Sequence, residues 1–134
     1  MRGHLQTLKG LVLRMREKGP LVLEEYRRKL SARMDEILEG KEFDKQRFMM
    51  EVAFFAERCN IDEELVRLES HREAFLASFE GSGAVGRKLD FLLQEMNREI
   101  NTIAAKSSDL EIAGLVVEGK SEIEKMREQV QNIE

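Results

Sequence analysis

Three side chains in the segment DEELVRLESH, residues 62–71, are of types that transfer protons or bind metal ions. Glu64, Arg67 and His71 are separated by three and then four residues, which places them on one side of a helix. A histidine beside a carboxylate and an arginine can exchange a proton near neutral pH or bind a metal ion. The plainer alternative is a helical ion pair with a histidine at the edge of the apolar stripe, and spacing alone favours that alternative.

Glutamates on the last two expected helices form a second candidate group: Glu95, Glu99, Glu118, Glu122 and Glu124. Some of these carboxylates would converge if the two helices paired antiparallel. Converging carboxylates can bind Mg²⁺ or Mn²⁺, which orients and activates a water molecule against a phosphodiester. The alternative, which the sequence alone favours, is an ordinary solvated face of charged side chains.

The helix expected over residues 86–106 has an unusual outer surface. Gln94, Asn97 and Asn101 lie in line with Asp90, although asparagine is a mediocre helix former. The basic residues on this helix and the next are Arg87, Lys88, Arg98, Lys106, Lys120, Lys125 and Arg127. Amides and cations together suit hydrogen bonding to sugars, bases and phosphates, and a solvated mixed-charge face is an equal alternative. Phe91 lies off the apolar stripe and could stack on a base or pack against another helix or subunit.

Composition limits the class of protein. Hydrophobic residues make up 42% and charged residues 36% of 134 positions, with one proline, which favours a helical domain rich in exposed charge over disorder. The net charge of −4 means that any nucleic-acid site must be a local patch. Cys59 is the only cysteine, so an internal disulfide and a cysteine-rich zinc site are excluded. The H-E-x-x-H pattern, a membrane-spanning run and a signal peptide are absent from the sequence, so we expect a cytoplasmic protein without membrane contact.

Apolar residues recur with helical periodicity in six stretches and predict an all-α fold. The stretches are 5–18, 20–38, 44–59, 61–79, 86–106 and 109–133, with Pro20 in the first turn of the second. Asn60 with Glu63, and Ser108 with Glu111, have the spacing of capping boxes. The stretch EGSGAVG, residues 80–86, is expected to connect two helices, because it lacks the G-K-[ST] ending of a nucleotide-binding loop. We therefore expect long antiparallel helices in an extended bundle or hairpin arrangement.

Several segments resemble the C-terminal region of the YicC/YloC family of bacterial proteins. They are EELVRLESH, GRKLDFLLQEMNREINTI, KS and REQVQNIE, and the spacing between them is also similar. The resemblance covers essentially the whole chain, is weakest over residues 1–40 and is nearly continuous over 51–134. Asn60 stands where the family usually has aspartate, and Ala104-Ala105 stands where Gly-Ser is common.

The resemblance implies an endoribonuclease that uses a divalent metal ion, Mn²⁺ or Mg²⁺, in a cytoplasmic homo-oligomer, a hexamer in the full-length protein. Family members are about twice this length, so residues 1–134 would be the helical C-terminal region of a longer protein whose N-terminal region is absent. Within it, 1–40 would be connecting helices and 41–134 the C-terminal family domain.

Candidate roles follow from the matched positions. The leading catalytic candidates are Glu95, Glu99 and His71, and the metal-binding candidates are Glu95 and Glu99. The RNA-binding candidates are Arg67, Arg87, Asn97, Arg98, Asn101 and Lys106. Two other classes of function stay open: a non-catalytic oligomerisation or RNA-binding scaffold whose chemistry lies in the missing N-terminal half, and a regulator that binds RNA or a partner nuclease without cutting.

Overall fold

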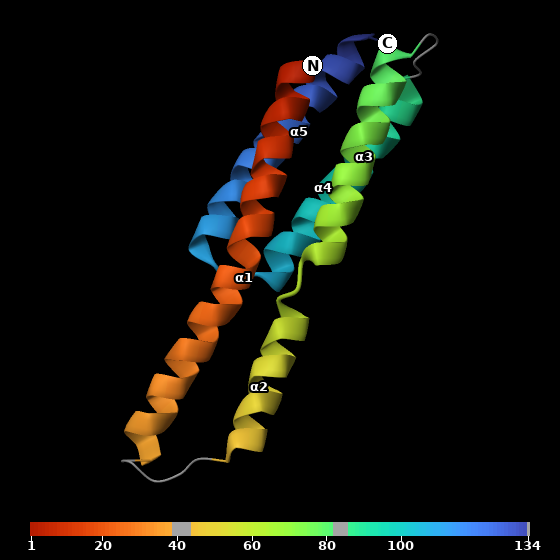
Figure 1. Cartoon of the computed structure of the whole chain (residues 1–134). Coiled ribbons are helices and arrows are strands. Elements are labelled where there is room, and N and C mark those ends of the chain that lie inside the picture. The colour runs from red at the N-terminus through yellow and green to blue at the C-terminus, as the bar shows by residue number, and fades with distance from the viewer. Residues whose placement is uncertain (39–43, 82–85, 134) are drawn as a thin grey trace.

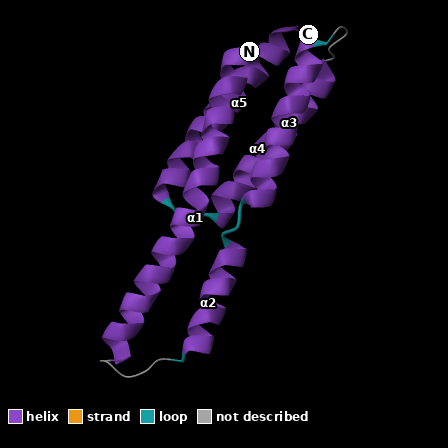
Figure 2. Ribbon diagram, viewed as in Figure 1, coloured by secondary structure: helices purple, strands orange, loops and turns teal. Residues whose placement is uncertain are grey.

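The protein is all-α in the part of the chain that a computed structural model describes, residues 1–38, 44–81 and 86–133 (Figure 2). Five helices occupy nearly all of it: α1 (Arg2–Leu38), α2 (Lys45–Arg58), α3 (Asp62–Glu80), α4 (Gly86–Lys106) and α5 (Leu110–Ile133). Gly40, at which the sequence predicts that the helix over 20–38 stops, and residues 82–85 of the expected connection lie outside the described residues. None of the described helices has both the length and the hydrophobicity that a membrane span requires.

One hydrophobic core joins four of the helices. The first half of α1 packs with α3, α4 and α5, while the second half of α1 and α2 run beside each other away from this bundle (Figure 1). The helical periodicity of apolar residues predicts one buried face each for the first half of α1, for α4 and for α5, and the structure confirms these faces. Their buried members are Leu5, Leu8, Val12 and Met15; Leu89, Leu92, Leu93, Met96, Ile100 and Ile103; and Ile112, Val116, Ile123, Met126 and Val130.

The prediction of a helix break at Pro20 is wrong. Residues 2–38 form a single helix with Pro20 in its interior, so the expected first two helices are one. Proline removes one backbone hydrogen bond from a helix. Tertiary packing outweighs this loss, because α1 is held by α3 and α5 before the proline and by α2 after it.

The two predicted capping boxes are also wrong in detail. Helix α3 begins at Asp62, its N-cap Ile61 makes no side-chain cap, and Asn60 Oδ1 accepts a hydrogen bond from Asp62 N instead. At α5, Asp109 Oδ2 accepts the capping hydrogen bond from Ile112 N, one residue after the predicted Ser108. Aspartate and asparagine oxygens compete for free amides at such positions, so spacing alone misplaces the cap.

The hairpin of α2 and the second half of α1 differs from the bundle in burial. No residue of α2 is buried. Its periodic apolar residues Phe48, Val52, Phe55 and Ala56, which helical spacing predicts to share one face, are half-buried. Tyr26 and Phe55 stack with ring centroids 3.6 Å apart. Large apolar side chains remain exposed here, among them Leu21, Ile37, Met49, Met50 and Phe54.

Candidate active site and adjoining groove

The candidate catalytic side chains meet where α3 and α4 run antiparallel. Along this contact Glu64 pairs with Lys106, and Arg67 pairs with Glu99. Residue numbers therefore rise along α3 as they fall along α4. The three α3 positions predicted to share one side, Glu64, Arg67 and His71, do so and face α4.

His71, Glu95 and Glu99 form a cluster in which one potential ligand atom from each residue lies within 4.8 Å of the others. His71 and Glu95 are half-buried, and Glu99 is buried. One imidazole nitrogen and two carboxylate oxygens fit a divalent cation, because carboxylates suit Mg²⁺ and Mn²⁺ and imidazole suits transition metals. The donor set is therefore better matched to Mn²⁺ than to Mg²⁺. Among the described residues this is the one such group that includes a histidine and two acidic side chains.

Arg67 fixes one side of this cluster. Its Nε donates a hydrogen bond of 3.1 Å to Glu99 Oε2, and this bond raises the pKa of the Arg67 guanidinium above its usual value. The Glu99 side chain is only 9% exposed, whereas that of Arg67 is 47% exposed. Glu99 is thus held in place by a cation that also faces solvent, and its other oxygen can serve a metal ion.

A second charged pair, Glu64 and Lys106, lies further along the α3–α4 contact, at the end of α4. Lys106 Nζ lies 2.7 Å from Glu64 Oε1 and also donates to the backbone oxygen of Asn60, 3.2 Å away. Burial raises the pKa of Glu64, but the hydrogen bond from Lys106 and the nearby charges of Lys106 and Arg67 outweigh it, so the pKa is lower than usual. Glu64 Oε2 is buried and has no hydrogen-bond partner among the described residues.

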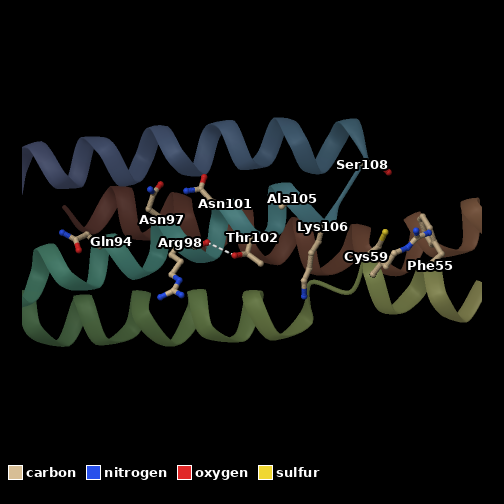
Figure 3. A pocket seen from close by; sticks show the side chains of 11 residues that line it. Phe55, Cys59, Gln94, Asn97, Arg98, Asn101, Thr102, Ala105, Lys106 and Ser108 are labelled. Carbon is tan, nitrogen blue, oxygen red and sulfur yellow. Dashed lines mark hydrogen bonds between the residues drawn. The ribbon is translucent and has the colours of Figure 1, made fainter.

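A groove of about 840 Å³ lies along the outer face of α4, beside the cluster (Figure 3). Asn97 and Asn101 point toward α5, whereas Arg98 and Lys106 point toward α3. The full lining is Phe55, Arg58 and Cys59 at the end of α2; Gln94, Asn97, Arg98, Asn101, Thr102, Ala105 and Lys106 of α4; and Ser108. Lys120 of α5 reaches the same face and donates to Asn101 Oδ1 at 2.6 Å.

The structure gathers most, but not all, of the candidate residues. His71, Glu95, Glu99 and Arg67 meet at the cluster, and Asn97, Arg98, Asn101 and Lys106 line the groove. Arg87 is exposed and belongs to neither group, and Phe91 is 56% exposed.

The idea that glutamates of α5 converge with those of α4 is wrong. Glu122 is hydrogen-bonded to His4 at the start of α1, because it faces α1 and not α4. Glu118 and Glu124 are exposed, and Glu124 lies near Arg127 one turn along.

The sequence reasoning missed the contribution of α2 to the groove. The helical periodicity of 44–59 predicts Phe55 only as one of its apolar residues and gives Arg58 no role, yet both line the groove. The one available signal was the position of Arg58, a cation just before the break between two helices. It also missed the pairing of Glu64 with Lys106, because these residues are 42 positions apart and only the register of α3 on α4 brings them together.

Residues 15–134 match the family described as "Endoribonuclease YicC-like, C-terminal". The chain belongs to this family. It is 47% identical over 128 residues to "Probable endoribonuclease YicC" of Clostridioides difficile (strain 630), an alignment that covers 95% of the chain and 44% of that relative. It is 42% identical over 121 residues to "Probable endoribonuclease YicC" of Haemophilus influenzae (strain ATCC 51907 / DSM 11121 / KW20 / Rd), covering 90% of the chain and 42% of the relative.

The chain thus spans less than half the length of these two relatives. The expected division at residue 40 and the expected hexamer stay predictions. The family match begins at residue 15, within α1.

Proposed function

We propose that this chain supplies the metal-binding and catalytic groups of an endoribonuclease. The observation that carries the proposal is the convergence of His71, Glu95 and Glu99 within 4.8 Å on the α3–α4 face. The names of the two relatives, both probable endoribonucleases, support RNA as the substrate. The cluster adjoins a groove whose cations and amides suit a polynucleotide.

Each side chain has a role that its position allows. Glu95 and Glu99 would hold a divalent cation, which when bound supplies Lewis acidity at a phosphate oxygen and lowers the pKa of water. His71 would be the third ligand of that cation, contributed by α3, because one of its ligand atoms lies in the same cluster. Arg67 keeps Glu99 Oε2 in place and presents positive charge to the phosphate.

The test is a cleavage assay of the 134-residue chain on a structured RNA with Mn²⁺, with Mg²⁺ and with EDTA. His71→Ala should lower the rate by about 10–100-fold or more, because losing a metal ligand should cost at least as much as losing a group that orients one. Glu95→Gln should lower it in a way that excess Mn²⁺ partly restores, because the variant loses a charged ligand but keeps the side-chain shape. Glu118→Gln, which removes an exposed carboxylate on α5, is the matched control and should cleave like wild type.

Full cleavage by His71→Ala and Glu95→Gln would show that the site lies elsewhere. Cleavage that persists in EDTA would contradict the metal requirement.

A specific observation favours self-association as a second role. The α1–α2 hairpin extends from the bundle and exposes Met50 and Phe54 by 52% and 55% (Figure 1). Exposed apolar groups of this size on adjacent helical turns are typical of protein–protein contacts. We therefore propose that the hairpin joins copies of this chain, in a homo-oligomer that presents several RNA sites.

A further inference from the structure

The groove along α4 has a charge opposite to that of the molecule. The chain has a net charge of −4, yet three cations line the groove, Arg58, Arg98 and Lys106, and no carboxylate of the described residues does. Lys106 is paired with Glu64, whereas Arg58 and Arg98 are exposed and make no ion pair within the described residues. Two exposed guanidinium groups that make no ion pair within the described residues favour a bound polyanion in this groove.

The part of the groove away from α2 is lined by amides, which carry both a donor and an acceptor (Figure 3). Gln94, Asn97 and Asn101 present them on successive turns of α4. Gln94 Nε2 donates to Asp90 Oδ2, and Asn101 Oδ1 accepts from Lys120 Nζ. Amide groups pair with base edges. In duplex RNA the major-groove edges lie too deep for side chains, so a surface that reads bases requires unpaired nucleotides.

An aromatic platform lies at the α2 end of the groove. Phe55 lines it and is itself stacked on Tyr26, with ring planes 5° apart. The two rings come from different helices, so each holds the other in orientation. Stacking on aromatic rings is the usual way in which proteins bind exposed bases.

The α3 side of the groove is the side on which the catalytic candidates lie, although none of them lines it. Arg98 and Lys106 line this side, and Arg98 directly precedes Glu99 on α4. Arg67 and Glu99 lie on this same side, so a strand in the groove would bring a phosphate toward the cluster.

We propose that this groove binds an unpaired segment of RNA, with Arg58 and Arg98 on its phosphates, the α4 amides on its bases and Phe55 beneath one base. The inference rests on the proposed function for its choice of RNA, and it adds a substrate class and two residues of α2. It assigns α2 to substrate recognition as well as to the fold.

The test measures binding in EDTA, so that it does not depend on cleavage. A labelled oligouridine of about 12 nucleotides, within the range bound by single-strand sites, is titrated with the 134-residue chain and followed by fluorescence anisotropy. The same oligouridine annealed to its complement is the duplex probe. We expect the single strand to bind about tenfold or more tightly than the duplex.

Arg58→Ala should weaken single-strand binding about five- to tenfold and lower the slope of log K against log salt by about 0.7, the value for one phosphate contact. Arg14→Ala is the matched control, because it removes the same charge from an exposed site of α1 outside the groove and should change neither quantity. Phe55→Leu should weaken binding about fivefold or more with the salt slope unchanged, since stacking involves no counterion release.

Duplex binding as tight as single-strand binding, or equal effects of Arg58→Ala and Arg14→Ala, would overturn the inference. Phe55→Leu also removes the stacking on Tyr26 that joins the two helices of the hairpin. Arg58 is exposed, so Arg58→Ala tests the groove without that effect on the fold. If groove variants leave affinity unchanged while His71→Ala stops cleavage, the groove inference fails and the proposed function stands. If the groove variants weaken binding but no metal ion supports cleavage, the proposed function fails and the groove stands.

Discussion

Glu64 is buried in the α3–α4 contact, where the cost of burying its carboxylate opposes the gain from its ion pair. It is 2% exposed, Lys106 pairs with one of its oxygens, and its other oxygen is buried without a partner among the described residues. A buried polar atom without a hydrogen bond is costly, so the ion pair with Lys106 has to offset that cost. Glu64 therefore contributes to stability only while it is ionised.

We expect Glu64→Gln to lower the free energy of unfolding by about 1–3 kcal/mol at neutral pH, because Lys106 loses its charged partner. The folded-state pKa of Glu64 lies below its usual value, so its contribution is complete above the usual pKa and is lost as the pH falls through the folded-state value. Urea unfolding of wild type and variant should thus differ most at neutral pH and progressively less below about pH 4.5.

Glu63→Gln is the control for this pH series. The Glu63 side chain is 82% exposed and 3.5 Å from Arg67, so its loss should change stability by less than about 0.5 kcal/mol at every pH. If Glu64→Gln lowered the free energy of unfolding by the same amount down to acidic pH, the shape of the Glu64 side chain, and not its charge, would account for its contribution to stability.

The side chains of the candidate site could be predicted from the sequence, but their partners could not. Helical spacing places Glu64, Arg67 and His71 on one side of α3, and the structure agrees. Spacing within one helix does not say which residues of another helix lie opposite. For that reason the sequence could only raise the convergence of α5 glutamates with Glu99 as one alternative, whereas the register of α3 on α4 brings His71 and Arg67 there.

At the scale of elements, α1 shows how packing can override a local signal. The sequence around Gly19-Pro20 predicts a break, and the structure has one helix of 37 residues. A proline in a helix interior lacks the amide that would donate to the preceding turn. The apolar stripe before it was read correctly, because burial in the bundle follows helical periodicity and not single breakers.

Pro20→Ala should therefore stabilise the protein by about 1–3 kcal/mol in urea unfolding, since it restores one helical hydrogen bond. Gly19→Ala is the matched control, because its added methyl group meets no atom within 4 Å and should add only about 0.5–1 kcal/mol of helix propensity. A gain no larger than that of Gly19→Ala would mean that the proline ring contributes packing against the α1–α2 contact that alanine cannot replace.

The α1–α2 hairpin gives a second prediction at this scale. Phe54→Glu and Met50→Glu should lower the molar mass measured by light scattering after size exclusion, because a charge on these exposed side chains would have to be buried between copies. Val117→Glu, at a 68% exposed apolar position on α5, should leave the mass unchanged. A monomeric wild type over the accessible concentration range would contradict self-association of this chain.

At the scale of the whole molecule, the site cannot be separated from the core. The row of charges lies on α3 and α4, and the apolar faces of these helices share one core with α1 and α5. The all-α class and the buried faces could be predicted, since both follow from periodicity. How far α2 stands from the bundle could not, because its apolar residues have the same spacing as those of a buried helix.

Because the candidate metal ligands lie on two helices of one core, metal binding should change the stability of the fold and can be measured without any RNA. A cation held by His71, Glu95 and Glu99 links α3 to α4, so it binds the folded chain in preference to the unfolded one. By linkage, stability rises by about 2.7 kcal/mol when the free cation is at about a hundred times its Kd, and the Tm should increase by several degrees with Mn²⁺. Mg²⁺ should give a smaller increase, because it rarely takes an imidazole ligand.

His71→Ala and Glu95→Gln should each remove most of the Mn²⁺-dependent increase in Tm, whereas Glu118→Gln should retain it, since that carboxylate lies on the exposed face of α5. An equal increase in all four proteins would place Mn²⁺ at scattered surface carboxylates. The Tm of each variant without metal is a second measurement. Because Glu95 and His71 crowd the buried Glu99, each substitution should leave the metal-free Tm nearly unchanged or raise it. Such an effect is common where a site serves binding and not stability.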